Sequence, residues 1–236
     1  MFVDLNTGLA QILIKDKPIL FVDTCSILNL FNSIHQSELS ESYVMAMNEL
    51  ILSHSKDLWL ISYETIYEEW RDNIDNVEKT LKRELARLDR NISVAYNVSN
   101  KLHHTKHKLP HKASLLSLSD FLKQQSEIFF DTSIVLERRD VHSLRGMHRV
   151  RRNLAPAKRG KPEPKDCEIV ECFLELAKEL RAHAYESRIL FLTANKDDFG
   201  KPQKLKPPLD HDFSNVNAEL VTNIDHALAI VKELVS

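Results

Sequence analysis

The feature that most constrains this chain is a run of four apolar residues, 19–22, that leads directly into Asp23. A strand that is apolar on both faces is typical of a buried parallel strand. In open α/β sheets, ligands bind at the carboxyl ends of such strands, so an acid at this position points toward a site. Asp23 is therefore the first candidate for chemistry. An acid here can also cap the next helix, but Thr24 and Ser26 can supply a cap without it.

Two further apolar runs, 58–61 and 189–192, have the same character and also lead into polar residues. Helical patterns separate these runs, and another short strand is predicted near 219–221. Strands that alternate with helical patterns predict an α/β fold with a mainly parallel central sheet. At 236 residues the chain is long enough to bury a sizeable core. We therefore predict a single domain, residues 1–236.

Residues from about 80 to 165 show helical periodicity and no strand pattern. We interpret this segment as a helical insertion in the sheet domain. A histidine-rich stretch, 103–111, lies inside it, and His103 and His107 are spaced to share a metal ion on one helix face. No carboxylate or cysteine lies nearby to complete such a site, so a solvated linker between two helices is favoured.

The net charge of −2 conceals a strongly basic window, residues 138–165. Ten lysines and arginines against two acids give this window a charge of +8, which leaves −10 for the rest of the chain. Such segregation predicts a polyanion-binding segment on an acidic body, the alternative being a solvated loop. The candidate nucleic-acid contacts are Arg145, Arg149, Arg151, Arg152, Lys158, Arg159, Lys161 and Lys165.

Composition disfavours several other classes of protein. The four glycines are too far apart for a dinucleotide fingerprint or a P-loop, so a nucleotide cofactor is not expected. The three cysteines lie in apolar patterns without metal-ligand spacing, which favours a reducing, cytoplasmic setting. No segment approaches the roughly 18 apolar residues that cross a membrane, and the start of the chain lacks the layout of a signal peptide. We expect a cytoplasmic protein with no membrane partner.

Four segments carry oxygen-bearing side chains to what a parallel sheet would make a single edge. They contribute Asp23; Glu68 or Glu69; Asp166; and Asn195 with Asp197 or Asp198. Clustered carboxylates repel each other strongly without a cation. Mg²⁺ and Mn²⁺ prefer oxygen ligands and tolerate several waters, so the pattern predicts a Mg²⁺ or Mn²⁺ site. Taken alone, Asp166 in the first turn of a helix is more simply an N-terminal acid.

In four short motifs the chain resembles the PIN-domain nucleases, within them the PIN-like branch with a long helical insertion. The motifs are FVDTCSIL (21–28), IYEEW (66–70), KDCEIV (165–170) and LTANKDDF (192–199). Their order and spacing cover most of the chain outside the insertion. The resemblance implies a three-layer α/β/α sandwich and metal-dependent hydrolysis of phosphodiester bonds, usually in RNA.

The resemblance also implies roles for single residues. The catalytic set is Asp23, Glu69, Asp166 and Asp198, which would hold one or two cations that activate water and stabilise charge on the phosphate. The basic window would follow the phosphate backbone in a salt-dependent way, with Thr193 as a further contact.

Two departures from the family pattern matter. Many members carry an acid where this chain has Asn195, which can still coordinate metal but reduces the negative charge, so a second cation would bind more weakly. The apolar neighbours of the helical acid select Glu69, whereas its spacing from Ser62 selects Glu68. We favour Glu69 and keep Glu68 as the alternative.

Two other functions compete with the nuclease hypothesis. A haloacid-dehalogenase-like phosphatase needs a second acid where this chain has Cys25, which disfavours it. The stronger rival is a catalytically weak nucleic-acid-binding or assembly module, with Asn195 as the sign of a decayed metal site. RNA is favoured over DNA. The pattern leaves open a role as a toxin, a defence effector or a processing enzyme, and a homodimer or a regulatory protein partner.

Overall fold

The computed structural model describes residues 2–32 and 41–235. Its centre is a six-stranded parallel sheet with the order β1-β4-β3-β2-β5-β8. The strands are β1 (Phe2–Val3), β2 (Ile19–Val22), β3 (Trp59–Tyr63), β4 (Ile134–Leu136), β5 (Ile189–Leu192) and β8 (Glu219–Val221). The four central strands are buried along their whole length, because helices cover both faces of the sheet. The predicted parallel sheet is confirmed.

The register of the sheet decides which residues meet at its carboxyl edge. β2 lies between β3 and β5, and its last residue, Val22, pairs with Leu192 of β5. Asp23 and Thr193 therefore leave the sheet side by side. β3 ends next to them and continues directly into a helix that begins at Glu64.

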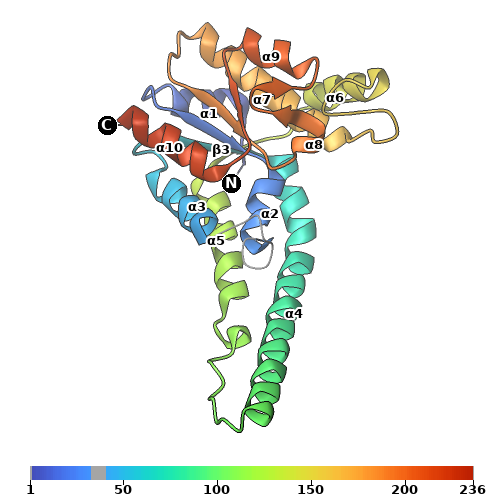
Figure 1. Cartoon of the computed structure of the whole chain (residues 1–236). Coiled ribbons are helices and arrows are strands. Elements are labelled where there is room, and N and C mark those ends of the chain that lie inside the picture. The colour runs from blue at the N-terminus through green and yellow to red at the C-terminus, as the bar shows by residue number, and fades with distance from the viewer. Residues whose placement is uncertain (1, 33–40, 236) are drawn as a thin grey trace.

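Helices on both faces of the sheet complete the three-layer α/β/α sandwich (Figure 1). One face carries α1 (Leu5–Ile12), α7 (Pro164–Ala182) and α9 (Leu209–Asn215). The opposite face carries α2 (Thr24–Asn32), α3 (Glu41–Ser53) and α10 (Ile224–Val235). Apolar residues of both layers and of the sheet form one continuous core.

The prediction that residues 80 to 165 contain no strand is wrong. β4 lies in this segment and pairs with β1 and β3, so the chain returns to the sheet before the basic window begins. β4 is only three residues long and follows Phe129 and Phe130 of a helix, so its apolar side chains continue the helical pattern. The segment before Asp16 forms the strand β1, which was not predicted, and the short helix α1.

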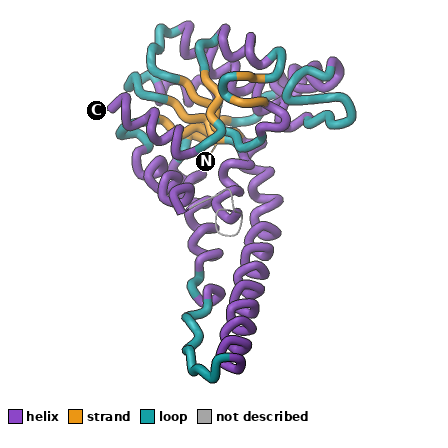
Figure 2. Tube along the Cα trace, in the orientation of Figure 1, coloured by secondary structure: helices purple, strands orange, loops and turns teal. Residues whose placement is uncertain are grey.

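The chain between β3 and β4 forms a projecting arm, residues 64–132 (Figures 1 and 2). Its first helix, α4 (Glu64–Leu102), has 39 residues, which corresponds to a length of about 58 Å. The chain turns at the tip, forms the short helix η1 (Ala113–Leu115), and returns as α5 (Leu118–Thr132) beside α4. At the base of the arm, the ring centroids of Trp70 and Phe130 lie 4.9 Å apart. None of the described helices is both long and apolar enough to cross a membrane.

The basic window consists of a helix and a loop. α6 (Asp140–Arg152) packs against α7, and a Cβ at Gly146 would lie 2.9 Å from the backbone nitrogen of Glu168, so only glycine allows this close approach. The loop 153–163 then leads into α7. Three short elements follow β5: α8 (Lys196–Phe199), β6 (Gly200–Lys201) and β7 (Lys204–Leu205).

Candidate active site

Asp23 follows the central strand β2 and is 5% exposed. One carboxylate oxygen, Oδ1, accepts a hydrogen bond from the Thr24 backbone N–H at 2.8 Å. The other, Oδ2, accepts from the Thr193 hydroxyl at 2.7 Å and from the Cys25 thiol at 3.0 Å. Burial raises the pKa of Asp23, and these hydrogen bonds only partly oppose that shift. The carboxylate is thereby held in one orientation at the edge of the sheet.

Two side chains that position Asp23 have roles that were not predicted. Thr193 was expected to contact nucleic acid, which is wrong, because its side chain is fully buried beside Asp23. Cys25 approaches from α2, with its Sγ atom 3.3 Å from the Thr193 hydroxyl. Burial and the adjacent Asp23 charge raise the pKa of the Cys25 thiol, so it stays protonated and can donate to the carboxylate.

The two adjacent glutamates of α4 face different surroundings. Glu69 Oε2 accepts a hydrogen bond from the Thr24 hydroxyl at 2.6 Å, which brings Glu69 to the same edge of the sheet as Asp23. Burial raises the pKa of Glu69, and the charge of Asp23 adds to the shift. Glu68 instead forms an ion pair with Arg138 at 2.8 Å. The structure therefore places Glu69 beside Asp23, and the alternative assignment of Glu68 as a metal ligand is wrong.

Asp166 lies in the first turn of α7, two residues after Pro164, which occupies a position where a helix has no need of a backbone N–H. Its Oδ2 accepts a hydrogen bond from Asn195 Nδ2 at 3.2 Å. Burial, followed by the charges of Asp23 and Glu69, raises the pKa of Asp166 to about 8. The negative charges of Asp23 and Glu69 thus disfavour ionisation of Asp166.

These acids line a pocket of about 310 Å³ at the carboxyl edge of the sheet. Its lining residues are Asp23, Thr24, Cys25, Leu28, Glu69, Asn73, Glu163, Asp166 and Asn195. Glu68 and Asp198 are the predicted ligands that do not line it. Glu163 lines it without having been predicted, because it lies in a proline-rich loop with no periodic pattern and adopts a left-handed conformation with φ of 41° just before α7.

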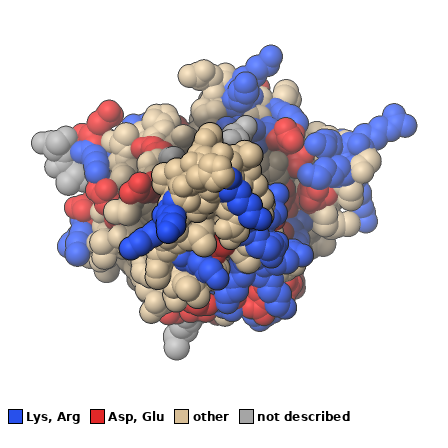
Figure 3. Space-filling view, turned by 60° about the horizontal axis from the view of Figure 1, so that its bottom comes forward, with Lys and Arg blue, Asp and Glu red and all other residues tan. Residues whose placement is uncertain are grey.

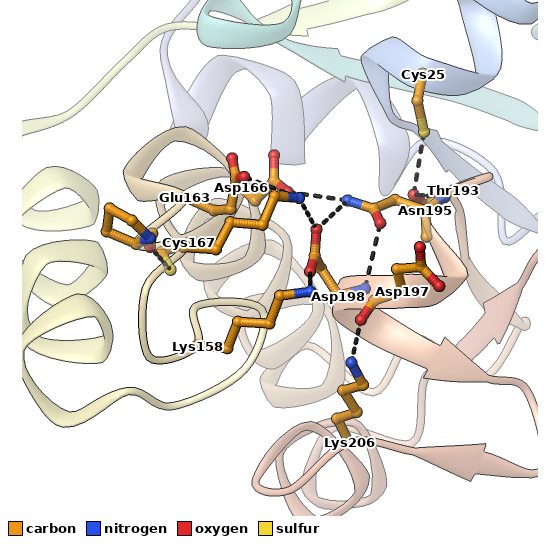
Figure 4. A network of polar contacts seen from close by, with 12 residues as sticks. Cys25, Lys158, Glu163, Asp166, Cys167, Thr193, Asn195, Asp197, Asp198 and Lys206 are labelled. Atoms are coloured by element: carbon orange, nitrogen blue, oxygen red, sulfur yellow. Dashed lines mark hydrogen bonds and ion pairs between the residues drawn. The ribbon is translucent and has the colours of Figure 1, made fainter.

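Asp198 forms ion pairs with two lysines of the loop 153–163 (Figure 4). Its side chain is fully buried, and its carboxylate pairs with Lys158 at 2.7 Å and with Lys161 at 2.6 Å. Burial alone would raise the pKa of Asp198, but hydrogen bonds from the two lysines and from Asn195 outweigh it and lower that pKa to about 2. In this structure the Asp198 carboxylate is paired with lysines, so its role as a metal ligand stays a prediction. The neighbouring Asp197 is exposed.

Asn195 connects two of the predicted acids (Figure 4). Its Nδ2 donates to Asp166 at 3.2 Å and to Asp198 at 3.0 Å, while its Oδ1 accepts from the backbone N–H of Asp198 at 3.2 Å. The oxygen that could bind metal is thus already the cap of α8. Asn195 thus bridges Asp166 and Asp198 in this structure, and its metal ligation stays a prediction.

The three acids that remain suit a hard divalent cation. Asp23, Glu69 and Asp166 supply only oxygen donors, and burial raises the pKa of all three carboxyl groups. Within residues 2–32 and 41–235, no group of three or more Asp, Glu, His or Cys side chains is placed so that it could hold a metal ion. Mg²⁺ commonly contacts one or two carboxylates and keeps several waters, so the pocket fits such an ion.

The basic window contains both buried and exposed cations. Arg149 is 6% exposed, and its guanidinium donates to the Ala155 carbonyl at 2.9 Å, to Asp212 at 2.7 Å and to Glu171. The prediction that Arg149 contacts nucleic acid is wrong, because this side chain ties α6 to the loop that follows it, to α7 and to α9. Five of the predicted nucleic-acid contacts are exposed and form no ion pair with Asp198. They are Arg145, Arg151, Arg152, Arg159 and Lys165.

Comparison with known proteins gives one match. A family model described as PIN domain matches residues 20–199, which is more than half of the chain. The matched range begins in β2, includes the arm and α7, and ends with α8. It therefore contains all four acids that line the pocket, Asp23, Glu69, Glu163 and Asp166. No curated protein and no solved structure matches the chain.

Proposed function

Because this chain belongs to the PIN-domain family, we propose that it is an endonuclease that hydrolyses phosphodiester bonds of RNA with a divalent cation. The observation that carries the proposal is the pocket at the carboxyl edge of the sheet, which is lined by the buried Asp23 and the partly buried Glu69 and Asp166, all with raised carboxyl pKa values. Strongly shifted carboxyl pKa values in a cleft are typical of functional sites.

The residues that would hold Mg²⁺ or Mn²⁺ are Asp23, Glu69 and Asp166. A bound divalent cation supplies Lewis-acid chemistry that lowers the pKa of water and offsets negative charge on a phosphate. Thr193 and Thr24 keep two of these carboxylates in place through hydrogen bonds of 2.7 and 2.6 Å. Such fixed orientation keeps the oxygen donors ready for the ion, so little reorganisation is needed on binding.

We propose that the pocket takes one cation. The fourth acid, Asp198, already has two ammonium groups within 2.7 Å and cannot attract a second divalent ion strongly. Lys161 also reaches Glu163 at 2.9 Å, which brings its ammonium group to the wall of the pocket. A positive charge at this wall can contact a phosphate that enters the pocket.

The surface cations of the basic window extend from this wall. Lys165 precedes Asp166 directly, and its charge is close enough to lower the pKa of Glu69 against the effect of burial. Together with Arg151, Arg152 and Arg159 it offers sequence-independent contacts to a phosphate backbone. Substrate binding is accordingly expected to weaken steeply as salt concentration rises.

A catalytically weak nucleic-acid-binding module is the second candidate, and the lysine pair on Asp198 favours it because that pair leaves fewer free ligands. Cleavage of end-labelled single-stranded RNA and DNA with Mg²⁺, Mn²⁺ or EDTA separates the two candidates. We expect Asp23→Asn and Asp166→Asn to abolish cleavage. Asp197→Asn is the matched control, since this exposed acid lies outside the pocket. Equal activity of the wild type and both pocket variants would refute the nuclease proposal.

A further inference from the structure

The tip of the arm carries an excess of positive charge. From residue 90 to residue 119 the sequence has no Asp or Glu, although the whole chain has a net charge of −2. This stretch contains five lysines and arginines and four histidines: Arg90, Lys101, Lys106, Lys108, Lys112, His103, His104, His107 and His111. All nine side chains are exposed. In Figure 3, which brings the end of the arm toward the viewer, lysine and arginine side chains lie along the sides of this projection.

The tip differs in this respect from the base of the arm. Near the base, Lys82 pairs with Glu78 and Asp120, and Lys123 pairs with Asp75. At the tip, Lys101, Lys106 and Lys108 form no ion pair with any described residue. Cations that form no ion pair with the described residues, gathered on a single projection, form an electrostatic footprint for a polyanion.

Side-chain hydrogen bonds hold the turn at the tip in shape. Asn100 donates to the His107 carbonyl at 3.1 Å and accepts from the His107 backbone N–H at 2.8 Å. Asp89 accepts from the backbone N–H groups of Ala113 and Ser114 at 2.8 and 3.0 Å. The lysines are therefore displayed on an ordered support, which reduces the entropy lost when they bind.

The arm is continuous with the proposed active site, because α4 contains both Glu69 and Lys101. At about 1.5 Å per residue, the helix carries Lys101 about 48 Å away from Glu69. We propose that the tip, residues 101–112, is a second nucleic-acid contact that binds the phosphate backbone of an RNA whose other end lies at the pocket. The choice of RNA as the ligand rests on the proposed function.

This geometry predicts a length threshold. An A-form RNA duplex rises less per base pair than the about 3.4 Å of B-DNA, so it needs more than about 14 base pairs to cover 48 Å. An RNA hairpin with a stem of about 24 base pairs can reach both places, whereas a stem of about 6 base pairs cannot. The tip therefore strengthens binding of the long hairpin alone.

The test neutralises three tip lysines, Lys101→Gln, Lys106→Gln and Lys108→Gln, and measures fluorescence anisotropy of both hairpins in EDTA, with identical single-stranded tails. The matched control neutralises three exposed lysines elsewhere, Lys15→Gln, Lys56→Gln and Lys178→Gln. Both proteins should bind the long hairpin more weakly at 200 mM salt than at 50 mM salt. We expect this fold-loss of affinity to be about 40 times smaller for the tip variant than for the wild type, because binding of the variant releases about 2.7 fewer counterions. The short hairpin and the control variant should show no such change.

An unchanged salt slope for the long hairpin would overturn the proposal, and so would an equal change for both hairpins. A tip variant that altered the oligomeric state in light scattering, with RNA affinity unchanged, would show that the tip contacts protein instead, which also overturns it. Because binding is measured in EDTA, the result does not depend on cleavage. Failure of the nuclease proposal appears separately, as absence of metal-dependent cleavage of the short hairpin by the wild type.

Discussion

Removing one charge from the pocket is expected to stabilise the metal-free protein while abolishing its proposed activity. The pKa of Asp166 is about 8 in the folded protein, against an ordinary value of 3.8, because of burial and the charges of Asp23 and Glu69. The folded state thus binds the Asp166 proton more tightly than the unfolded state does. This contribution to stability is complete below about pH 4 and is lost as the pH rises through about 8.

The size of the effect follows from the shift. About four pKa units at 1.36 kcal/mol each set an upper limit of about 6 kcal/mol between pH 4 and pH 9. The repulsion that raises the pKa of Asp166 also acts on Asp23 and Glu69, so the repulsion energy is counted once for the three acids together. We therefore expect Asp166→Asn to raise the free energy of unfolding by about 2–3 kcal/mol at pH 9 in EDTA, with little change at pH 4. The loss of a favourable charge at the start of α7 costs less, about 0.3–1 kcal/mol.

Urea unfolding followed by fluorescence of the buried Trp59 and Trp70 measures this difference at pH 4, 7 and 9. Asp197→Asn, which removes an exposed acid from α8, is the control and should change stability little at any of these pH values. Saturating Mg²⁺ or Mn²⁺ should stabilise the wild type by about 2.7 kcal/mol at 100 times the dissociation constant, and the variant by much less. A variant that is less stable than the wild type at pH 9 in EDTA would refute the reasoning.

Three further predictions test single residues. Glu69→Gln should lower metal-dependent cleavage at least 100-fold while Glu68→Gln leaves it unchanged, as a gel assay of labelled RNA can measure, since only Glu69 lines the pocket. Thr193→Val should lower the rate of cleavage more than tenfold because Asp23 loses a buried hydrogen bond of 2.7 Å, and Thr193→Ser, which keeps the hydroxyl, should restore most of it. Arg149→Ala should lower the free energy of unfolding by about 1–3 kcal/mol in urea titrations, because two partly buried carboxylates lose their partner.

The parts of the fold that could be predicted are those in which one residue type repeats on a buried face. β2 is apolar on both faces because helices cover both sides of the sheet, so its position and the exit of Asp23 follow from local sequence. α6 shows the limit of this reasoning. Its buried face consists of His142, Gly146 and Arg149, which fall at helical spacing but are not apolar, so a hydrophobic pattern misses them.

The parts of the site that could not be predicted depend on contacts between distant segments. Lys158 and Lys161 are 40 and 37 residues before Asp198 in the sequence, and only the path of a glycine- and proline-containing loop brings them to it. The same loop places Glu163 at the pocket. The orientation of an adjacent pair such as Glu68 and Glu69 depends likewise on what each side chain meets in the folded protein.

These distant contacts also change the meaning of Asn195. A site that has lost its metal would be expected to lose the constraints on its former ligands, yet the Asn195 amide is fixed by three hydrogen bonds. Its NH₂ group donates to both Asp166 and Asp198, which a carboxylate at this position could not do and would instead repel. The Asn195 amide can thus link Asp166 to Asp198, whose charge is already offset by two lysines. These contacts favour the proposed site for one cation over decay as the reason for Asn195.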